Sequence, residues 1–149
     1  MSRRALSSKS RRRKMNNSAR KRFSADKLSD MIANELESYS EEITLATKEV
    51  IWDVTDRFVG RTRGDAPVGR RKGQYKRAIA SKTAFESRYK LVEVWYVRGY
   101  EYRLAHILNN GHAKKGGGFV RGDKHISKNE EIARKELEQG IEAVIKNGY

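Results

Sequence analysis

The sequence predicts an α+β fold with a long helix, a β-rich middle and a final helix. Apolar residues of positions 25–59 recur every three or four residues, the period of an amphipathic helix. The run 88–97 is rich in β-branched and aromatic residues, as strands are. A second amphipathic stretch covers 128–146. The chain has 149 residues, so we expect one domain over 25–149.

Residues 1–24 are expected to form an extended basic arm in front of this domain. They hold ten bases, no acid and few apolar residues, so folding alone cannot offset their chain entropy. The candidate nucleic-acid or partner-binding residues are Arg3, Arg4, Lys9, Arg11, Arg12, Arg13, Lys14, Arg20, Lys21 and Arg22. Such charges bind phosphates without reading sequence. Docking on the acidic helix of a neighbouring subunit, or a solvated tail, are the other interpretations.

The charges of the chain alternate in blocks. The net charge is +14, of which the arm contributes +10, residues 25–59 contribute −6 and residues 60–126 contribute +11. This alternation favours contacts between a basic part of one subunit and an acidic part of the next. There is no cysteine, which excludes disulfides, thiol catalysis and cysteine-based metal sites.

The long helix is expected to begin after Ser24, a good N-cap, and to end at Gly60. At 1.5 Å per residue it would be about 52 Å long. A small domain cannot cover a helix of that length. We therefore expect its outer end to pack on another subunit.

Residues 60–74 are expected to form a basic loop, since they hold four glycines and the only proline. Gly64 and Gly69 have the spacing of a phosphate-binding loop. Arg70 and Arg71 follow where that loop needs Lys and Ser or Thr, so we exclude nucleotide binding of this kind. We favour an assembly loop, although contact with nucleic acid stays open. Its candidate residues are Arg61, Arg63, Arg70, Arg71 and Lys72.

The middle of the chain, 75–126, is expected to hold a small β-sheet with one short helix. Residues 75–80 predict a helical turn that leads into a strand, and both faces of strand 88–97 should be partly covered. Residues 101–109 suit a short helix, and 119–120 a short strand.

The final helix, 128–146, is preceded by Ser127, with Glu130 three residues further on. This spacing predicts a capping box, in which the serine hydroxyl and the glutamate carboxylate satisfy backbone N–H groups of the first turn.

The three histidines give no clear catalytic or metal pattern. His106 and His112 are six residues apart, which fits no helical face, and neither has a carboxylate beside it. A general base at His106 or His125 would suit a small ribonuclease toxin, but no distinctive spacing supports it. We favour structural or interfacial roles and expect no metal, no cofactor and no catalytic residue.

A family resemblance lies in the order of several motifs. Residues 104–112 read Leu-Ala-His-Ile-Leu-Asn-Asn-Gly-His, and a glycine-rich spacer, Lys124-His125-Ile126-Ser127 and an acidic amphipathic helix follow. Upstream stand Ala66-Pro67-Val68, a glycine and then Tyr75-Lys76-Arg77-Ala78-Ile79. Over roughly 25–147 this order resembles the neck proteins of long-tailed bacteriophages, called minor capsid, head–tail joining or tail-completion proteins. The matching positions are Pro67, Gly69, His106, Gly111, His112 and His125.

The resemblance implies a structural virion protein without enzymatic activity. It implies a homo-oligomeric ring, expected to be six-fold, at the top of the tail, with other neck and tail proteins and packaged double-stranded DNA as partners. The protein would be made in the host cytoplasm and end in the virion. No apolar run has the length of a membrane span. The alternatives are a sequence-nonspecific nucleic-acid-binding accessory protein and, with less support, a small ribonuclease toxin.

Overall fold

The structure, a computed structural model, describes residues 25–69 and 71–148. It confirms the predicted α+β class. The predicted arm, 1–24, lies outside the described residues. The elements in chain order are α2 (Ala25–Asp65), α3 (Gln74–Ala78), β1 (Ile79–Ser87), β2 (Lys90–Val97), the 3₁₀ helix η1 (Gly99–Glu101), α4 (Tyr102–Asn110), β3 (Gly111–Ala113), β4 (Phe119–Arg121) and α5 (His125–Asn147).

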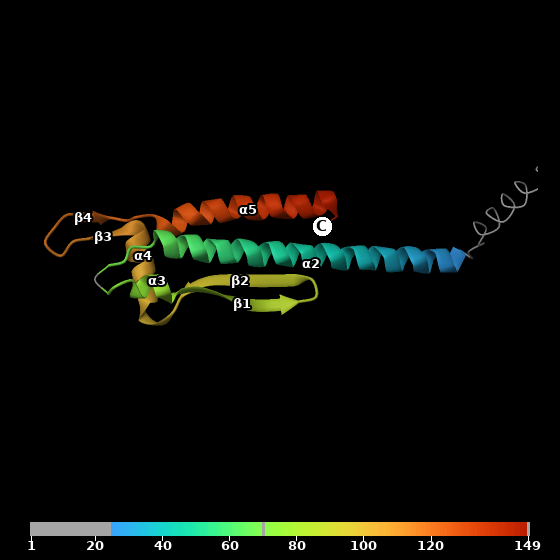
Figure 1. Ribbon diagram of the computed structural model, residues 1–149, viewed down its shortest axis with the longest axis horizontal. Coiled ribbons are helices and arrows are strands. Elements are labelled where there is room, and N and C mark those ends of the chain that lie inside the picture. The colour runs from blue at the N-terminus through green and yellow to red at the C-terminus, as the bar shows by residue number, and fades with distance from the viewer. Residues whose placement is uncertain (1–24, 70, 149) are drawn as a thin grey trace, which may run out of the picture. The chain divides into compact units, whose positions relative to one another are not determined.

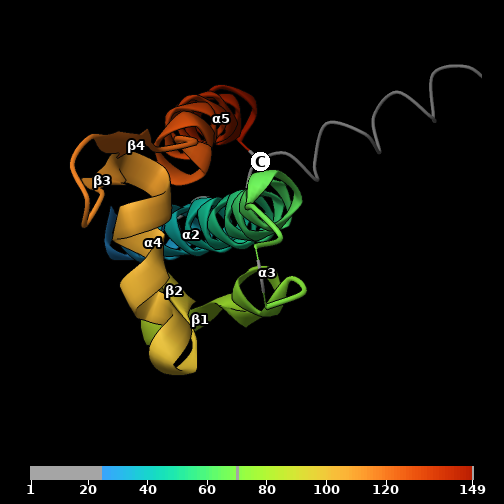
Figure 2. The same cartoon turned by 90° about the vertical axis from the view of Figure 1, so that its left-hand side faces the viewer.

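The chain divides into two units between Ser38 and Tyr39, a boundary that falls within α2. Within the second unit, α2 lies between α5 on one side and the hairpin of β1 and β2 on the other (Figures 1 and 2). A Cβ on Gly140 of α5 would lie 2.5 Å from Cγ1 of Val50. Glycine at this position therefore lets the two helices approach closely.

The β1–β2 hairpin is antiparallel, with a register shift between Thr83 and Phe85. The strand predicted over 88–97 begins at Lys90, and residues 91–96 are all partly buried, as expected. A two-stranded hairpin is marginal in water by itself. It is tied to α2 by an ion pair between Lys48 Nζ and Glu86 Oε1 at 2.9 Å.

The predicted single β-sheet is instead two separate two-stranded sheets, because β3 and β4 pair only with each other. A Cβ on Gly111 would lie 2.3 Å from the carbonyl oxygen of Val120, and one on Gly122 would lie 2.2 Å from that of Asn109. Gly111 therefore permits the close pairing of β3 with β4, and Gly122 lets the end of the hairpin lie directly against the end of α4.

The predicted end of the long helix at Gly60 is wrong, since α2 continues to Asp65. Thr62 is fully buried, and its hydroxyl accepts a hydrogen bond from Trp95 Nε1 at 3.0 Å. Ala66, just past the helix, is also buried. This packing outweighs the roughly 1 kcal/mol that a glycine inside a helix costs. The loop predicted over 60–74 is therefore confined to 66–73.

The predicted start of the final helix is also displaced. The helix α5 begins at His125, three residues before the predicted position, and ends at Asn147. Its N-cap residue, Lys124, has a positive φ of 60° and makes no side-chain capping bond. The predicted capping box of Ser127 and Glu130 is therefore wrong, because both residues lie inside the helix.

The hydrophobic core is small and lies beside the C-terminal part of α2. Trp95, Leu104, Ala105, Leu108 and Ala78 are partly buried around it. The buried cluster itself consists of Val59, Ala66, Tyr75, Ile79 and Val97. The modest apolar fraction of the sequence, 37%, fits a core of this size.

The N-terminal stretch of α2 carries a row of exposed apolar side chains. Leu28, Met31, Ile32, Leu36 and Tyr39 are each between 50% and 62% exposed. We call them the apolar stripe. None of the helices in the described part of the chain is long and apolar enough to span a membrane.

Candidate assembly site at the end of the long helix

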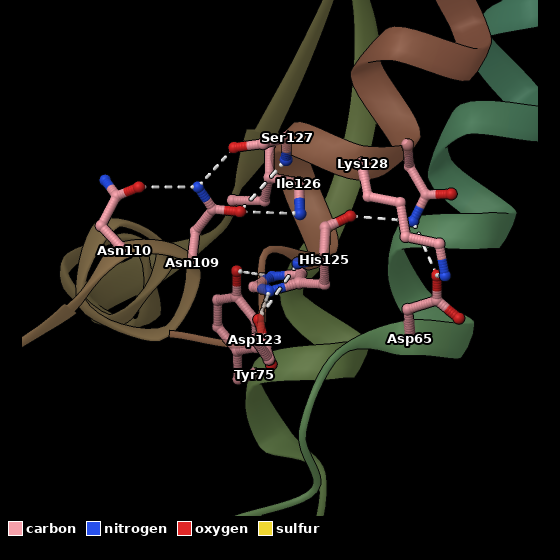
Figure 3. Close-up of polar contacts among 10 residues, drawn as sticks. Asp65, Tyr75, Asn109, Asn110, Asp123, His125, Ile126, Ser127 and Lys128 are labelled. Carbon is pink, nitrogen blue, oxygen red and sulfur yellow. Dashed lines mark hydrogen bonds and ion pairs between the residues drawn. The ribbon is translucent and has the colours of Figure 1, made fainter. Parts of the chain in front are cut away.

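A chain of buried hydrogen bonds lies where α2 ends (Figure 3). The Tyr75 hydroxyl is 2.8 Å from Nε2 of His125, and Nδ1 of His125 is 2.5 Å from Oδ1 of Asp123. Tyr75 and His125 are only 3% and 1% exposed. Because a carboxylate can only accept, Nδ1 donates this hydrogen bond, and in a neutral imidazole Nε2 then accepts from the tyrosine hydroxyl.

A Tyr–His–Asp chain is a possible proton relay, but its environment disfavours that use. Burial raises the pKa of the Tyr75 hydroxyl to about 12, and the charge of Asp123 adds to the effect. A nucleophile or base needs access to substrate and a pKa near the working pH. This tyrosine is protonated and buried, so the geometry suits a structural link between α3 and α5.

Asn109, the penultimate residue of α4, caps the N-terminus of α5. Its Oδ1 accepts hydrogen bonds from the backbone N–H groups of Ile126 and Ser127, at 3.0 and 3.1 Å. Its Nδ2 donates to the Ser127 hydroxyl at 2.8 Å (Figure 3). The first N–H groups of a helix have no partner within it. Here a side chain from another helix supplies the acceptor.

The end of α2 joins the same site through Asp65. Its Oδ2 accepts a hydrogen bond at 2.9 Å from Nδ2 of Asn129, which also donates to the His125 carbonyl oxygen at 2.8 Å. The Asn129 hydrogen bond and the nearby Lys128 ammonium hold the pKa of Asp65 below its usual value. We call Asp65, Tyr75, Asn109, Asp123, His125 and Asn129 the junction, since it ties together α2, α3, α4 and α5.

The loop 66–73 covers one side of a pocket of about 510 Å³ next to the junction. Arg71 closes the loop onto η1, because its Nη1 is 2.9 Å from Oε1 of the buried Glu101. The other oxygen, Oε2, is buried without a hydrogen-bond partner among the described residues. The pocket is lined by Pro67, Val68, Gly69, Arg71, Tyr75, Tyr100, Glu101, Arg103, Leu104 and Leu108.

The pocket opens at a basic surface. The guanidinium of Arg103 lies 5.8 Å from the ring centre of Tyr100 and 5.9 Å from that of Tyr102, which are cation–π contacts. Arg98 is exposed beside it, in a shallow hollow that Arg71 also lines. We call Arg71, Arg98 and Arg103 the basic rim. Glu101 pairs with Arg71 alone in the described ion pairs, so the rim keeps a positive charge.

The five residues predicted for an assembly loop do not all lie in one loop. Arg61 and Arg63 lie on α2: the first makes two hydrogen bonds to the Glu136 carboxylate, at 3.0 and 2.8 Å, and the second binds the Ile79 carbonyl oxygen. The guanidinium of Arg61 also lowers the pKa of Glu136. Arg71 and Lys72 are in the loop. Arg70 lies outside the described residues.

Only some of the positions that carry the family resemblance lie close together in the structure. Pro67 and Gly69 line the pocket, and His125 is in the junction one hydrogen bond away from Tyr75, which also lines it. Gly111 has a φ of 87° and accommodates β4. His106, whose Nδ1 is 2.9 Å from Asn110 Nδ2, and His112 are both exposed.

No group of three or more histidine or acidic side chains within the described residues could hold a metal ion. The two histidines considered as general bases, His106 and His125, differ in their exposure. His125 is too buried to reach an RNA phosphate, whereas His106 is exposed but has an asparagine rather than an acid as its partner.

Sequence reasoning missed most of the junction. Asn109 was interpreted only as part of a helix ending, although an amide at the end of one helix can cap another. The composition could have singled out Glu101 as the partner of a base, since it is one of only five acids among the 21 charged residues of 60–126. Asp65 and Asn129 are 64 residues apart, and nothing local indicated that they meet.

Comparisons with known proteins add nothing to this site. No family model matches the chain, and neither the curated proteins nor the solved structures contain a match to it. The case for a function therefore rests on the residues of the chain itself.

Asn109→Ala should lower the free energy of unfolding by about 1–2 kcal/mol, because it leaves two N–H groups in the first turn of α5 without their side-chain acceptor. Glu130→Ala is the matched control, since among the described residues the ion pair of Glu130 is with Arg134, at 3.7 Å on the surface. It should cost less than about 0.5 kcal/mol. Urea unfolding followed by circular dichroism measures both. Equal losses would contradict capping by Asn109.

Stability should fall between pH 10 and 12 because of Tyr75. In the unfolded chain this phenol loses its proton near pH 10, whereas the folded state holds it to about 12. The contribution is complete below pH 10 and lost as the pH rises through 12, an amount of about 2–3 kcal/mol. The measurement is the unfolding free energy against pH for wild type and Tyr75→Phe. Parallel curves above pH 10 would contradict it.

Proposed function

We propose that the chain is a structural subunit of the bacteriophage neck, acting in head–tail joining or tail completion, and that it assembles as a ring without catalysing a reaction. The sequence resemblance over roughly 25–147 suggests this function. The observation that carries the proposal in the structure is the apolar stripe of α2, whose five side chains are at least half exposed.

An exposed stripe of this kind favours association. Burying apolar surface gains about 25 cal/mol per Å², and contiguous exposed apolar side chains usually mark an interaction surface. The helical spacing of Leu28, Ile32 and Leu36 continues the row that further along includes Val50, which packs on α5. The face of α2 that packs on α5 at Val50 is exposed at Leu28, Ile32 and Leu36. This exposed part is suited to packing on another chain.

The roles of the resemblance residues also support a structural protein. His125 is enclosed by hydrogen bonds, Gly111 permits a close backbone approach, and Pro67 shapes the loop at the pocket. Each of these roles holds elements together. In this proposal the arm, 1–24, meets packaged DNA or a neighbouring subunit, and the ring has six copies.

A nucleic-acid-binding accessory protein is the second candidate, and specific cations favour it. Arg63, Lys76 and Arg77 bind backbone carbonyl oxygens of Ile79, Gly64 and Lys72 rather than carboxylates, so their charges are not neutralised. This reading predicts a monomer whose DNA affinity falls steeply with salt. The ring proposal predicts a defined oligomer at the same salt concentrations.

The proposal predicts that the protein occupies the head–tail junction of virions. The test is immunogold electron microscopy of gradient-purified particles, with an antibody raised against this chain and, as a control, one against a tail-fibre protein. Gold should gather at the top of the tail with the first antibody only. Unlabelled particles, with free protein in the lysate, would contradict the neck function and support the accessory protein.

A further inference from the structure

We infer that the apolar stripe on α2 of one copy docks in the pocket of the next copy, with acids of the helix facing the basic rim. The inference rests on the proposed ring and names the two surfaces that would form it. A contact between two different surfaces of the same protein is heterologous, and it gives a ring when the rotation closes.

The pocket and the apolar stripe both present apolar side chains. The pocket, about 510 Å³, has walls of Val68, Leu104 and Leu108. Leu28, Ile32 and Leu36 recur every four residues, so they form one ridge of the helix, and helices pack by placing such ridges in grooves.

The charges beside the apolar stripe and beside the pocket are opposite in sign. At 100° per residue, Glu35 and Glu42 lie at the edge of the ridge formed by Leu28 and Ile32. Glu35 is exposed, and α2 is acidic over 25–59, with a net charge of −6. Two members of the basic rim, Arg71 and Arg103, line the pocket, and the third, Arg98, lines the adjoining hollow. A second copy of this chain therefore brings both apolar side chains and the complementary charge.

Contacts within the chain order the side chains that line the pocket. Arg71 ties the loop 66–73 to Glu101, and Arg103 lies within cation–π distance of Tyr100 and Tyr102. Ordering these groups before association reduces the entropy that binding costs. DNA phosphates would satisfy the charges of the rim, but they offer nothing to the apolar walls. The pocket and rim together favour a protein helix.

A charge swap in the full-length protein tests the inference. Glu35→Arg and Arg103→Glu should each weaken assembly by about tenfold or more, since each places like charges together. The double variant Glu35→Arg/Arg103→Glu should recover most of that loss, because the pair is restored in reverse. The readout is the oligomer fraction against concentration by mass photometry, at low and high salt.

The controls are Glu138→Arg and Arg134→Glu, which make the same changes at exposed positions of α5. Both should assemble as wild type does. Ile32→Ser, at an exposed position, should weaken assembly without changing the circular dichroism of the chain. Wild-type assembly by all the variants would overturn the docking inference and leave the ring proposal standing. A wild-type protein that stays monomeric would overturn both.

A further outcome separates protein docking from DNA binding at the rim. If Arg103→Glu lowered the affinity for double-stranded DNA while assembly stayed at the wild-type level, the rim would be a phosphate site and the inference would be wrong. We expect Arg103→Glu to weaken assembly and to leave the affinity for double-stranded DNA close to that of the wild type.

Discussion

The hydrogen bonds of His125 join parts of the chain that lie far apart in sequence. Its ring links Tyr75 to Asp123, and its carbonyl oxygen accepts from Asn129, which also holds Asp65. A buried polar group without partners costs free energy, so these side chains must meet for the fold to form. The position of the loop 66–73, and with it the pocket, follows from this junction.

The length of α2 imposes the second constraint. The hairpin and α5 flank the part of the helix in the second unit, while the apolar stripe is at least half exposed. Such a helix is stable when something else covers its apolar face. The chain itself offers complementary features in the pocket and the basic rim. In the proposed ring, a second copy would cover these exposed side chains.

Periodic patterns predicted the elements, and long-range contacts decided their ends. The α+β class, the long helix and α4 followed from local spacing. Gly60 fitted a helix end by local rules, but the helix continues because Thr62 is buried and accepts a hydrogen bond from Trp95. Ser127 fitted a capping box, yet Asn109 supplies the cap from another helix. Local rules cannot reveal a partner 17 residues away, and so most of the junction was missed.

The most direct test of the account is sedimentation velocity of the wild-type protein from low to high micromolar concentration. We predict one oligomer of fixed stoichiometry, with no further growth as concentration rises, since a closed ring uses up both docking surfaces. A monomer over the whole range would contradict the claim that copies of the chain complete each other. Open-ended growth would contradict closure.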